Sequence, residues 1–341
     1  MAQLVAAPAI ATRRATGLVA GVGALLLVSA LSLAVGAKPI PLQTVLDAVF
    51  AYDPTNADQL IVRQLRLPRT VVGLLVGAAL GAAGTVMQGL TRNPLADPGI
   101  LGVNAGAALF VVIGIYSFGL TSLLGYVWFA FAGAAVASLI VYSLGSIGRE
   151  GATPVKLALA GAALTALLGS ITTAILLVDV DTLDQFRFWI VGSLAGRTAT
   201  IASTVAPFIA IGLLLALCCA PLLNTLALGD DVARGLGQRV GWSRAAGAAC
   251  IVLLCGAATA AAGPIVFVGL AVPHIARAVT GPDYRWIMPY SMILAPVLLV
   301  GADVIGRVVA RPGELQVGIV TAILGAPIFI ALVRSQKIAD L

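Results

Sequence analysis

Charged residues are scarce in this sequence of 341 residues. Asp, Glu, Lys and Arg together make up 10% of it, whereas hydrophobic residues make up 60%. Soluble domains carry about 25% charged residues, which bind water over the surface of the fold. The shortage argues against a water-soluble enzyme of this length. The composition predicts a protein whose natural solvent is the lipid bilayer.

Several kinds of functional site are missing as well. The lysines follow Ala37, Val155 and Gln336, so none stands in the Gly-Lys-Ser/Thr pattern of a phosphate-binding loop. His274 is the only histidine, which excludes a His-rich metal site. The cysteines lie in apolar stretches without CxxC spacing, which is typical of packing residues: Cys218, Cys219, Cys250 and Cys255. We therefore predict no bound metal and no cofactor. The net charge of +6 is scattered between apolar runs, so nucleic-acid binding is not expected either.

Long windows without charge locate the expected membrane spans, because a charge at the bilayer centre is costly. Two windows need interpretation. Pro98–Gly148 is long enough for two crossings, with a break near Ser117–Ser122. Ala245–Ala276 is either one long helix or two helices separated at Gly263–Pro264. The count is thus nine or ten helices, from the following windows: Ala15–Ala37, Thr70–Thr91, Pro98–Gly148, Leu157–Val178, Thr198–Gly229, Ala245–Ala276, Trp286–Ala302 and Leu315–Val333.

The basic residues give a weak indication of orientation. Arg13 and Arg14 precede the first apolar run, which is long for a signal peptide and predicts a first helix that starts in the cytoplasm. Ten helices place both termini there, and basic residues then favour the inside loops slightly. The triplet Arg63, Arg66 and Arg69 is retained on the outside, against this bias.

Acidic residues are absent from the middle of the expected spans. The nearest is Asp303, and its spacing of four from Arg307 predicts a local helical pair near the outer surface. Ion-coupled secondary transporters commonly use a mid-membrane acid, and an intramembrane enzyme needs a catalytic pair inside its spans. The sequence therefore disfavours both classes.

Two short segments between spans are expected to form helices outside the bilayer. Asp179–Arg197 carries aromatic residues and suits an interfacial helix on the outside. Asn224–Arg244 lies on the inside and contains a short amphipathic helix, bounded by Gly229 and by Gly235 or Gly237. Glycines at spacing four, Gly73/Gly77/Gly81 and Gly102/Gly106, favour close helix packing within this chain over a pore-lining role.

Four stretches together resemble the iron-siderophore and vitamin B12 permease family of ABC importers. They are RLPRTVVGLLVGAALGAAGTVMQGLTRNPLADPGILGVNAGA (66–107), LNTLALGDDVARGLG (223–237), GPIVFVGLAVPHIAR (263–277) and ADVIGR (302–307) followed by ELQVGIVTAILGAPIFI (314–330). The resemblance implies an all-α polytopic membrane protein of about ten transmembrane helices. These would form two inverted five-helix halves, at about residues 1–195 and 196–341.

The resemblance also implies a function. The chain would be the permease subunit that forms the translocation pathway for a ferric siderophore or related metal chelate in the cell membrane. A cobalamin or haem importer is the alternative cargo class. The implied partners are a dimer of ATP-binding cassette subunits, an extracytoplasmic substrate-binding protein and a second permease chain. We expect that second chain to be a homologous heterodimer partner rather than another copy.

Three sets of residues match positions with known roles in the family. Arg66, Arg69 and Arg307 would receive acidic side chains of the binding protein, the alternative being anchorage to phospholipid headgroups. The turn residues Asn93, Pro94 and Leu95 would form a cytoplasmic gate. The inside helix would couple to the ATPase, the alternative being an ordinary loop, and its residues are Gly229, Asp230, Asp231, Ala233, Arg234 and Gly235.

Overall fold

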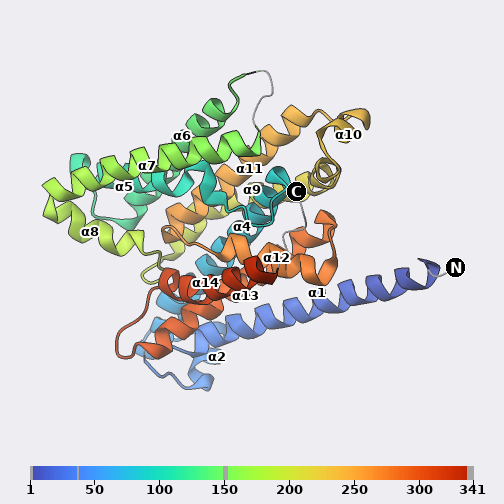
Figure 1. Cartoon of the computed structure of the whole chain (residues 1–341). Coiled ribbons are helices and arrows are strands. Elements are labelled where there is room, and N and C mark those ends of the chain that lie inside the picture. The colour runs from blue at the N-terminus through green and yellow to red at the C-terminus, as the bar shows by residue number, and fades with distance from the viewer. Residues whose placement is uncertain (1–2, 37, 149–152, 336–341) are drawn as a thin grey trace.

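The computed structural model describes residues 3–36, 38–148 and 153–335, and every regular element in that part is helical (Figure 1). The longer helices are α1 (Gln3–Ala34), α4 (Leu67–Thr91), α5 (Val103–Phe118), α6 (Leu123–Gly145), α7 (Pro154–Val178), α9 (Ala199–Ala227), α11 (Val240–Ala262), α12 (Val268–Thr280), α13 (Tyr284–Val309) and α14 (Val317–Ser335). The shorter ones are α2 (Leu42–Phe50), α3 (Ala57–Ile61), the π-helix η1 (Val62–Arg66), the 3-10 helix η2 (Pro98–Leu101), α8 (Val180–Ile190) and α10 (Asp230–Gly235).

In the part of the chain that the structure describes, seven helices are long and apolar enough to cross a membrane, and three shorter apolar helices, α5, α12 and most of α14, accompany them. Both windows that needed interpretation contain two helices. Residues 98–148 hold α5 and α6, separated by a turn at 119–122, and residues 245–276 hold the end of α11 and most of α12. Gly263 ends α11 with a φ of 77°, a conformation that glycine adopts without strain. The expected interfacial helix forms as α8.

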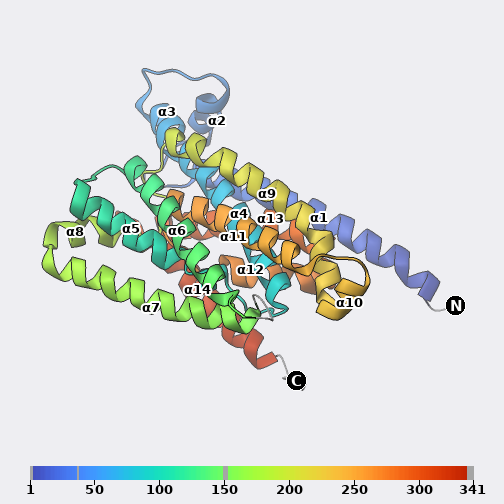
Figure 2. The same ribbon diagram turned by 90° about the horizontal axis from the view of Figure 1, so that it is seen from above.

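The bundle has two distinct ends. In both views α2 and α8 lie toward one end, and α10 and the beginning of α1 lie toward the other (Figures 1 and 2). We call these the α8 end and the α10 end. The helix α14 runs toward the α10 end, so the described beginning and end of the chain point the same way.

Helix α4 is the central element of the bundle, because it packs against α9, α11, α12 and α13. Its glycines allow this. A Cβ on Gly77 would lie 2.5 Å from Cα of Pro296, and one on Gly81 would lie 2.4 Å from the carbonyl oxygen of Ser291, both in α13. Gly106 of α5 lies equally close to the backbone of Gly133 in α6. The glycine pairs therefore serve helix packing within the chain, as the sequence indicates.

Gly84 lies on the same glycine-lined surface of α4, and a substitution there tests the close packing of the helices. A Cβ there would lie 1.8 Å from the carbonyl oxygen of Gly269, so Gly84→Ala must separate α4 from α12. We expect a loss of at least about 1–3 kcal/mol in the free energy of unfolding, measured by thermal denaturation in detergent. Gly169→Ala in α7 is the control, since nothing lies within 4 Å of its Cβ position. Equal melting temperatures for the two variants would contradict the close contact.

The beginning of α4 differs from the sequence-based expectation. The window opens at Thr70, whereas the chain is continuously helical from Ala57 through η1 into α4. Pro68 has no N–H to donate to a preceding carbonyl, which explains why the regular ladder is interrupted by a π-turn just before it. The three arginines at 63, 66 and 69 thus lie on a helix rather than in a loop. Helix α2 was not predicted from the sequence either.

Candidate functional site

A basic pocket of about 400 Å³ opens at the α8 end of the bundle. Its walls come from the segment after α1, from η1 and α4, from the loop between α8 and α9, and from the α13 region. Arginines dominate its charged side chains, and Glu314 is the only acidic residue among those that line it in the described structure. The lining residues are Gly36, Lys38, Ile61, Gln64, Leu65, Arg66, Arg69, Ala195, Gly196, Arg197, Thr198, Arg307 and Glu314.

Two of these arginines are neutralised inside the chain. Nη2 of Arg69 lies 2.7 Å from Asp303, and its Nη1 lies 2.6 Å from Glu314. Arg307 pairs with the same Asp303 from one turn further along α13. The expected pair of Asp303 and Arg307 is therefore present. It is buried, however, and Asp303 is shared between two guanidinium groups that approach from α4 and α13.

Arginines also cap the end of α1. The last carbonyls of a helix have no partner within it and carry a partial negative charge. Arg66 donates from Nη1 to the carbonyls of Leu33 and Ala34, at 2.8 and 2.7 Å, and from Nη2 to that of Lys38. Nη1 of Arg307 donates to the carbonyls of Ser32 and Val35. These bonds attach α1 to the start of α4 and the end of α13.

The structure thus brings together the three arginines that the sequence marks for docking. Arg66, Arg69 and Arg307 line one pocket, although their side chains are buried and already hydrogen-bonded within the chain. From the sequence, these arginines were interpreted as basic residues on the outside that need an acidic partner. For Arg69 and Arg307 that partner is already present in the same chain, as Asp303 and Glu314.

Arg197 is a further member of the cluster that sequence reasoning missed. It is 4% exposed, and its Nε donates to the carbonyl of Ser193 at 3.0 Å. Among the residues that the structure describes, no carboxylate forms an ion pair with it. Burial, and then the nearby charge of Arg69, lower the pKa of Arg197 to about 10. Its charge is therefore retained at neutral pH without a counter-charge. In the sequence, Arg197 was marked only by its place at the end of the outside segment Asp179–Arg197.

At the α10 end, the predicted short helix forms between α9 and α11. Helix α10 begins after Gly229, whose φ is 104°, and ends at Gly235. Asp231 and Arg234 project from it and pair with each other at 2.9 Å. Ala233 is completely buried and anchors the helix to the bundle. The apolar residues Leu228, Val232 and Leu236 recur at every fourth position of this segment and are all exposed, and we call them the apolar stripe.

The two aspartates of α10 have different surroundings. The side chain of Asp231 is 99% exposed, whereas that of Asp230 is only 23% exposed. Asp230 accepts hydrogen bonds from Arg92 at 3.3 Å and from Arg244 of α11 at 2.8 Å. Arg92 is the residue that ends α4, with a φ of 51°. Asp230 therefore links α10 to both the end of α4 and the beginning of α11.

The turn that follows Arg92 is stiffened by its own side chains. The Oδ1 atom of Asn93 accepts a hydrogen bond from the backbone N–H of Leu95 at 2.9 Å, and the carbonyl of Asn93 accepts one from Ala96. Asp97 does the same for Gly99 at the start of η2. The chain then folds back toward the middle of α4, because Pro98 and Leu80 both border Gly269. The predicted gate residues thus form a rigid turn at the α10 end.

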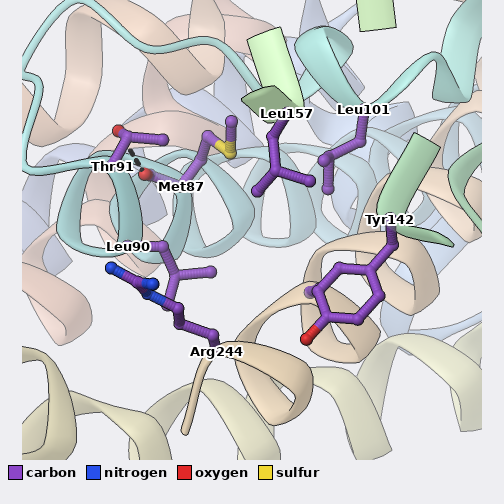
Figure 3. Close-up of a pocket in the computed structure, with 8 residues that line it drawn as sticks. Met87, Leu90, Thr91, Leu101, Tyr142, Leu157 and Arg244 are labelled. Atoms are coloured by element: carbon purple, nitrogen blue, oxygen red, sulfur yellow. Dashed lines mark hydrogen bonds between the residues drawn. The ribbon is translucent and has the colours of Figure 1, made fainter. Parts of the chain in front are cut away.

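A narrow apolar pocket lies against the last turn of α4 (Figure 3). Arg244, which holds Asp230, stands beside Leu90 of α4 in this pocket, so the ion pairs of α10 sit directly on the last turn of α4. The pocket is lined by Met87, Leu90, Thr91, Leu101, Tyr142, Leu157, Arg244 and Ala248.

Comparison with known proteins identifies the family. Residues 24–335 match the FecCD transport family. The chain is 49% identical to the ferric enterobactin transport system permease protein FepD of Escherichia coli, over 92% of this chain and 93% of that protein. It is 46% identical to the probable siderophore transport system permease protein YfiZ of Bacillus subtilis, over 85% and 87%. Among solved structures, an inward-facing metal-chelate type ABC transporter matches with a TM-score of 0.82 and 26% identity, covering 94% of this chain and 99% of that one.

Proposed function

The chain belongs to the FecCD transport family and is a multi-pass permease subunit of an ABC importer, and we propose that its cargo is a ferric siderophore. The observation that carries the proposal is the match of nearly the whole chain to siderophore permeases at 46–49% identity. Cobalamin and haem remain the alternative cargoes, because a wide pore lined by small and apolar residues would suit any of these bulky chelates.

We further propose that the α10 end faces the cytoplasm and binds an ATP-binding cassette dimer. The exposed stripe of Leu228, Val232 and Leu236 supports this assignment, since such a stripe on a short segment outside the spans is typical of a protein contact. The rigid turn of Asn93, Pro94 and Leu95 would act as one lip of the cytoplasmic gate. Both chain termini would then be cytoplasmic.

The α8 end would face outward and receive the substrate-binding protein. Four arginines around one pocket, Arg66, Arg69 and Arg307 among them, favour carboxylates as the groups that dock there. Arg69 and Arg307 would then act mainly by shaping the pocket and holding α1, because Asp303 and Glu314 already neutralise them.

For the membrane domain as a whole, we propose ten crossings in two inverted five-helix halves. The seven long spans and the three shorter apolar helices supply the required number. The pore would form between this chain and a second, homologous permease chain, as expected from the family pattern in siderophore systems.

Reconstitution tests this function directly. Proteoliposomes with this chain alone are expected to take up no iron-labelled chelate, because the sequence has no phosphate-binding loop to hold ATP. Uptake is expected only with the ATPase, the binding protein and the second permease chain, and with ATP inside. A panel of ferric catecholate, hydroxamate and citrate chelates, with cobalamin and haem, identifies the cargo.

Three results would each overturn one of these proposals. Uptake by the chain without an ATPase would contradict the assignment of ATP hydrolysis to a separate subunit. Full uptake with this chain as the sole permease would contradict the heterodimer, and preferential uptake of cobalamin or haem would contradict the siderophore.

A further inference from the structure

The arginines of the basic pocket differ in how many of their N–H groups are already committed. Arg307 commits all of them, to Asp303, to the hydroxyl and carbonyl of Ser32 and to the carbonyl of Val35. Arg69 commits each of its nitrogens to a carboxylate. Neither side chain has charge left for a new partner.

The other two arginines retain their charge. Arg66 bonds only to backbone carbonyls, which orient the guanidinium without neutralising it. Arg197 commits only Nε, again to a carbonyl, so in the described structure both of its terminal nitrogens remain available. The pocket therefore holds more positive than negative charge, and the excess resides on Arg66 and Arg197.

The position of Arg197 is fixed by its loop. The N–H of Ser193 donates to the carbonyl of Ala262 at the end of α11, and Gly318 of α14 donates to the carbonyl of Gly192. A Cβ on Gly318 would lie 1.9 Å from the carbonyl oxygen of Val191, so the loop and α14 are in direct contact. A guanidinium held this way is preorganised and loses little entropy on binding a partner.

Arg197 also lines a second cavity, of about 260 Å³. Arg197 is the one charged residue among those that line this second cavity in the described structure. The buried cation thus lines two cavities at the α8 end and is reachable from them, although it is shielded from bulk water.

We infer that Arg197, together with Arg66, binds a carboxylate side chain of the substrate-binding protein. The inference rests on the proposed function, which assigns the α8 end to that partner. Charge complementarity selects an acidic group. The place of the pocket, among loops at the end of the bundle, favours a docking protein over the phosphate of a lipid. Glu314 faces the same pocket, and Arg69 compensates its charge.

The test measures the affinity of the loaded binding protein for the complete importer in nanodiscs, at several salt concentrations. Arg197→Glu is expected to raise Kd at least about tenfold, and Arg197→Gln by somewhat less, because a desolvated charge pair is lost. Arg197→Lys is expected to retain part of the affinity, since it keeps the charge but not the planar fork. The salt dependence of Kd should become weaker in the Glu and Gln variants.

Arg187→Glu is the matched control. This arginine also lies near the α8 end, on α8 itself, but it is exposed, pairs with Asp184 and does not line the pocket. We expect its Kd to change less than about twofold. Thermal melting and co-purification of the ATPase verify folding. If Arg197→Glu misfolds, the Gln and Lys variants decide the outcome.

The outcomes separate this inference from the proposed function. If Arg66→Glu loses docking and all Arg197 variants bind normally, the docking site stands and the role of Arg197 is refuted. If neither position affects Kd or its salt dependence, docking at this pocket is itself refuted. If Arg197→Glu releases a tightly bound anionic phospholipid, detected by mass spectrometry, while docking is unaltered, the occupant is a lipid phosphate and the inference fails.

Discussion

Asp230→Asn is expected to lower ATP-driven uptake about tenfold or more while the ATPase still co-purifies with the permease. Asp230 carries the ion pairs that join α10 to Arg92 and Arg244. Without its charge, two arginines are left near each other and the helix is released from the end of α4. Coupling free energies between sites are typically about 1–3 kcal/mol, which corresponds to a change of this size.

The physical reason is the short path from α10 to the proposed gate. Arg92 ends α4, and the rigid turn of Asn93, Pro94 and Leu95 follows it directly. A displacement of α10 by the ATPase would therefore be passed through Asp230 to the gate turn. ATP hydrolysis should continue in the variant, so the ratio of chelate transported to ATP hydrolysed is the quantity to measure.

Asp231→Asn is the matched control for this experiment. It is the same chemical change one residue further along α10, but Asp231 is exposed and pairs only with Arg234 of its own helix. Its uptake should stay within about twofold of the unaltered protein, because an exposed ion pair contributes little. Equal losses in the two variants would mean that the negative charge of α10, rather than the link to Arg92, matters.

Val232→Asp separates binding of the ATPase from transmission. Val232 lies in the exposed apolar stripe and forms no part of the ion pairs. A charge there should weaken co-purification of the ATPase, which Asp230→Asn leaves intact. If Val232→Asp left co-purification unchanged, the stripe would not be the ATPase contact.

Much of the fold can be predicted from the sequence because the bilayer imposes a strong rule. Charges at its centre are costly, so charge-free windows mark spans, and Gly263 and the residues near Ser122 mark the breaks within them. Helix α10 could be placed for a related reason, since glycines bound a short amphipathic segment. Helix α2 was not predicted because its nine residues are too few for a membrane span and include the charged Asp47.

The site was harder to predict because its contacts join distant parts of the chain. Arg69 meets Asp303 and Glu314, which are 234 and 245 positions away. The pattern of four between Asp303 and Arg307 revealed only the local half of that cluster. Asp230 and Asp231 are adjacent and alike in sequence, and only the position of Arg92 and Arg244 in space distinguishes them. Arg197 lacked a motif altogether.

Asp303→Asn is expected to destabilise the protein strongly. The side chain of Asp303 is 1% exposed and is shared by two buried guanidinium groups, of Arg69 and Arg307. Removing one partner of a buried ion pair costs about 3–5 kcal/mol, because the remaining charge stays desolvated and unpaired. The measurement is thermal unfolding of the purified protein in detergent, together with the yield of monodisperse protein.

Asp184→Asn is the control, because it breaks the ion pair with Arg187 on α8, where the carboxylate is 54% exposed. Its cost should be about 0–1 kcal/mol. If the two losses were equal, the cluster at Asp303 would not be desolvated as the structure indicates.

A double variant shows why Asp303→Asn loses stability: either an attraction is lost, or a buried cation is left without its carboxylate. Arg69→Gln combined with Asp303→Asn should recover part of the stability lost in Asp303→Asn alone, because one of the two buried cations that lose Asp303 is removed. Glu314, the other partner of Arg69, is 31% exposed and can be solvated by water, so its release should add little cost. Arg307 keeps its hydrogen bonds to the carbonyls at the end of α1 in every variant, and these bonds keep α1 attached to the bundle. If the double variant were less stable than the sum of its single changes predicts, then Arg69 would stabilise the fold through contacts other than Asp303.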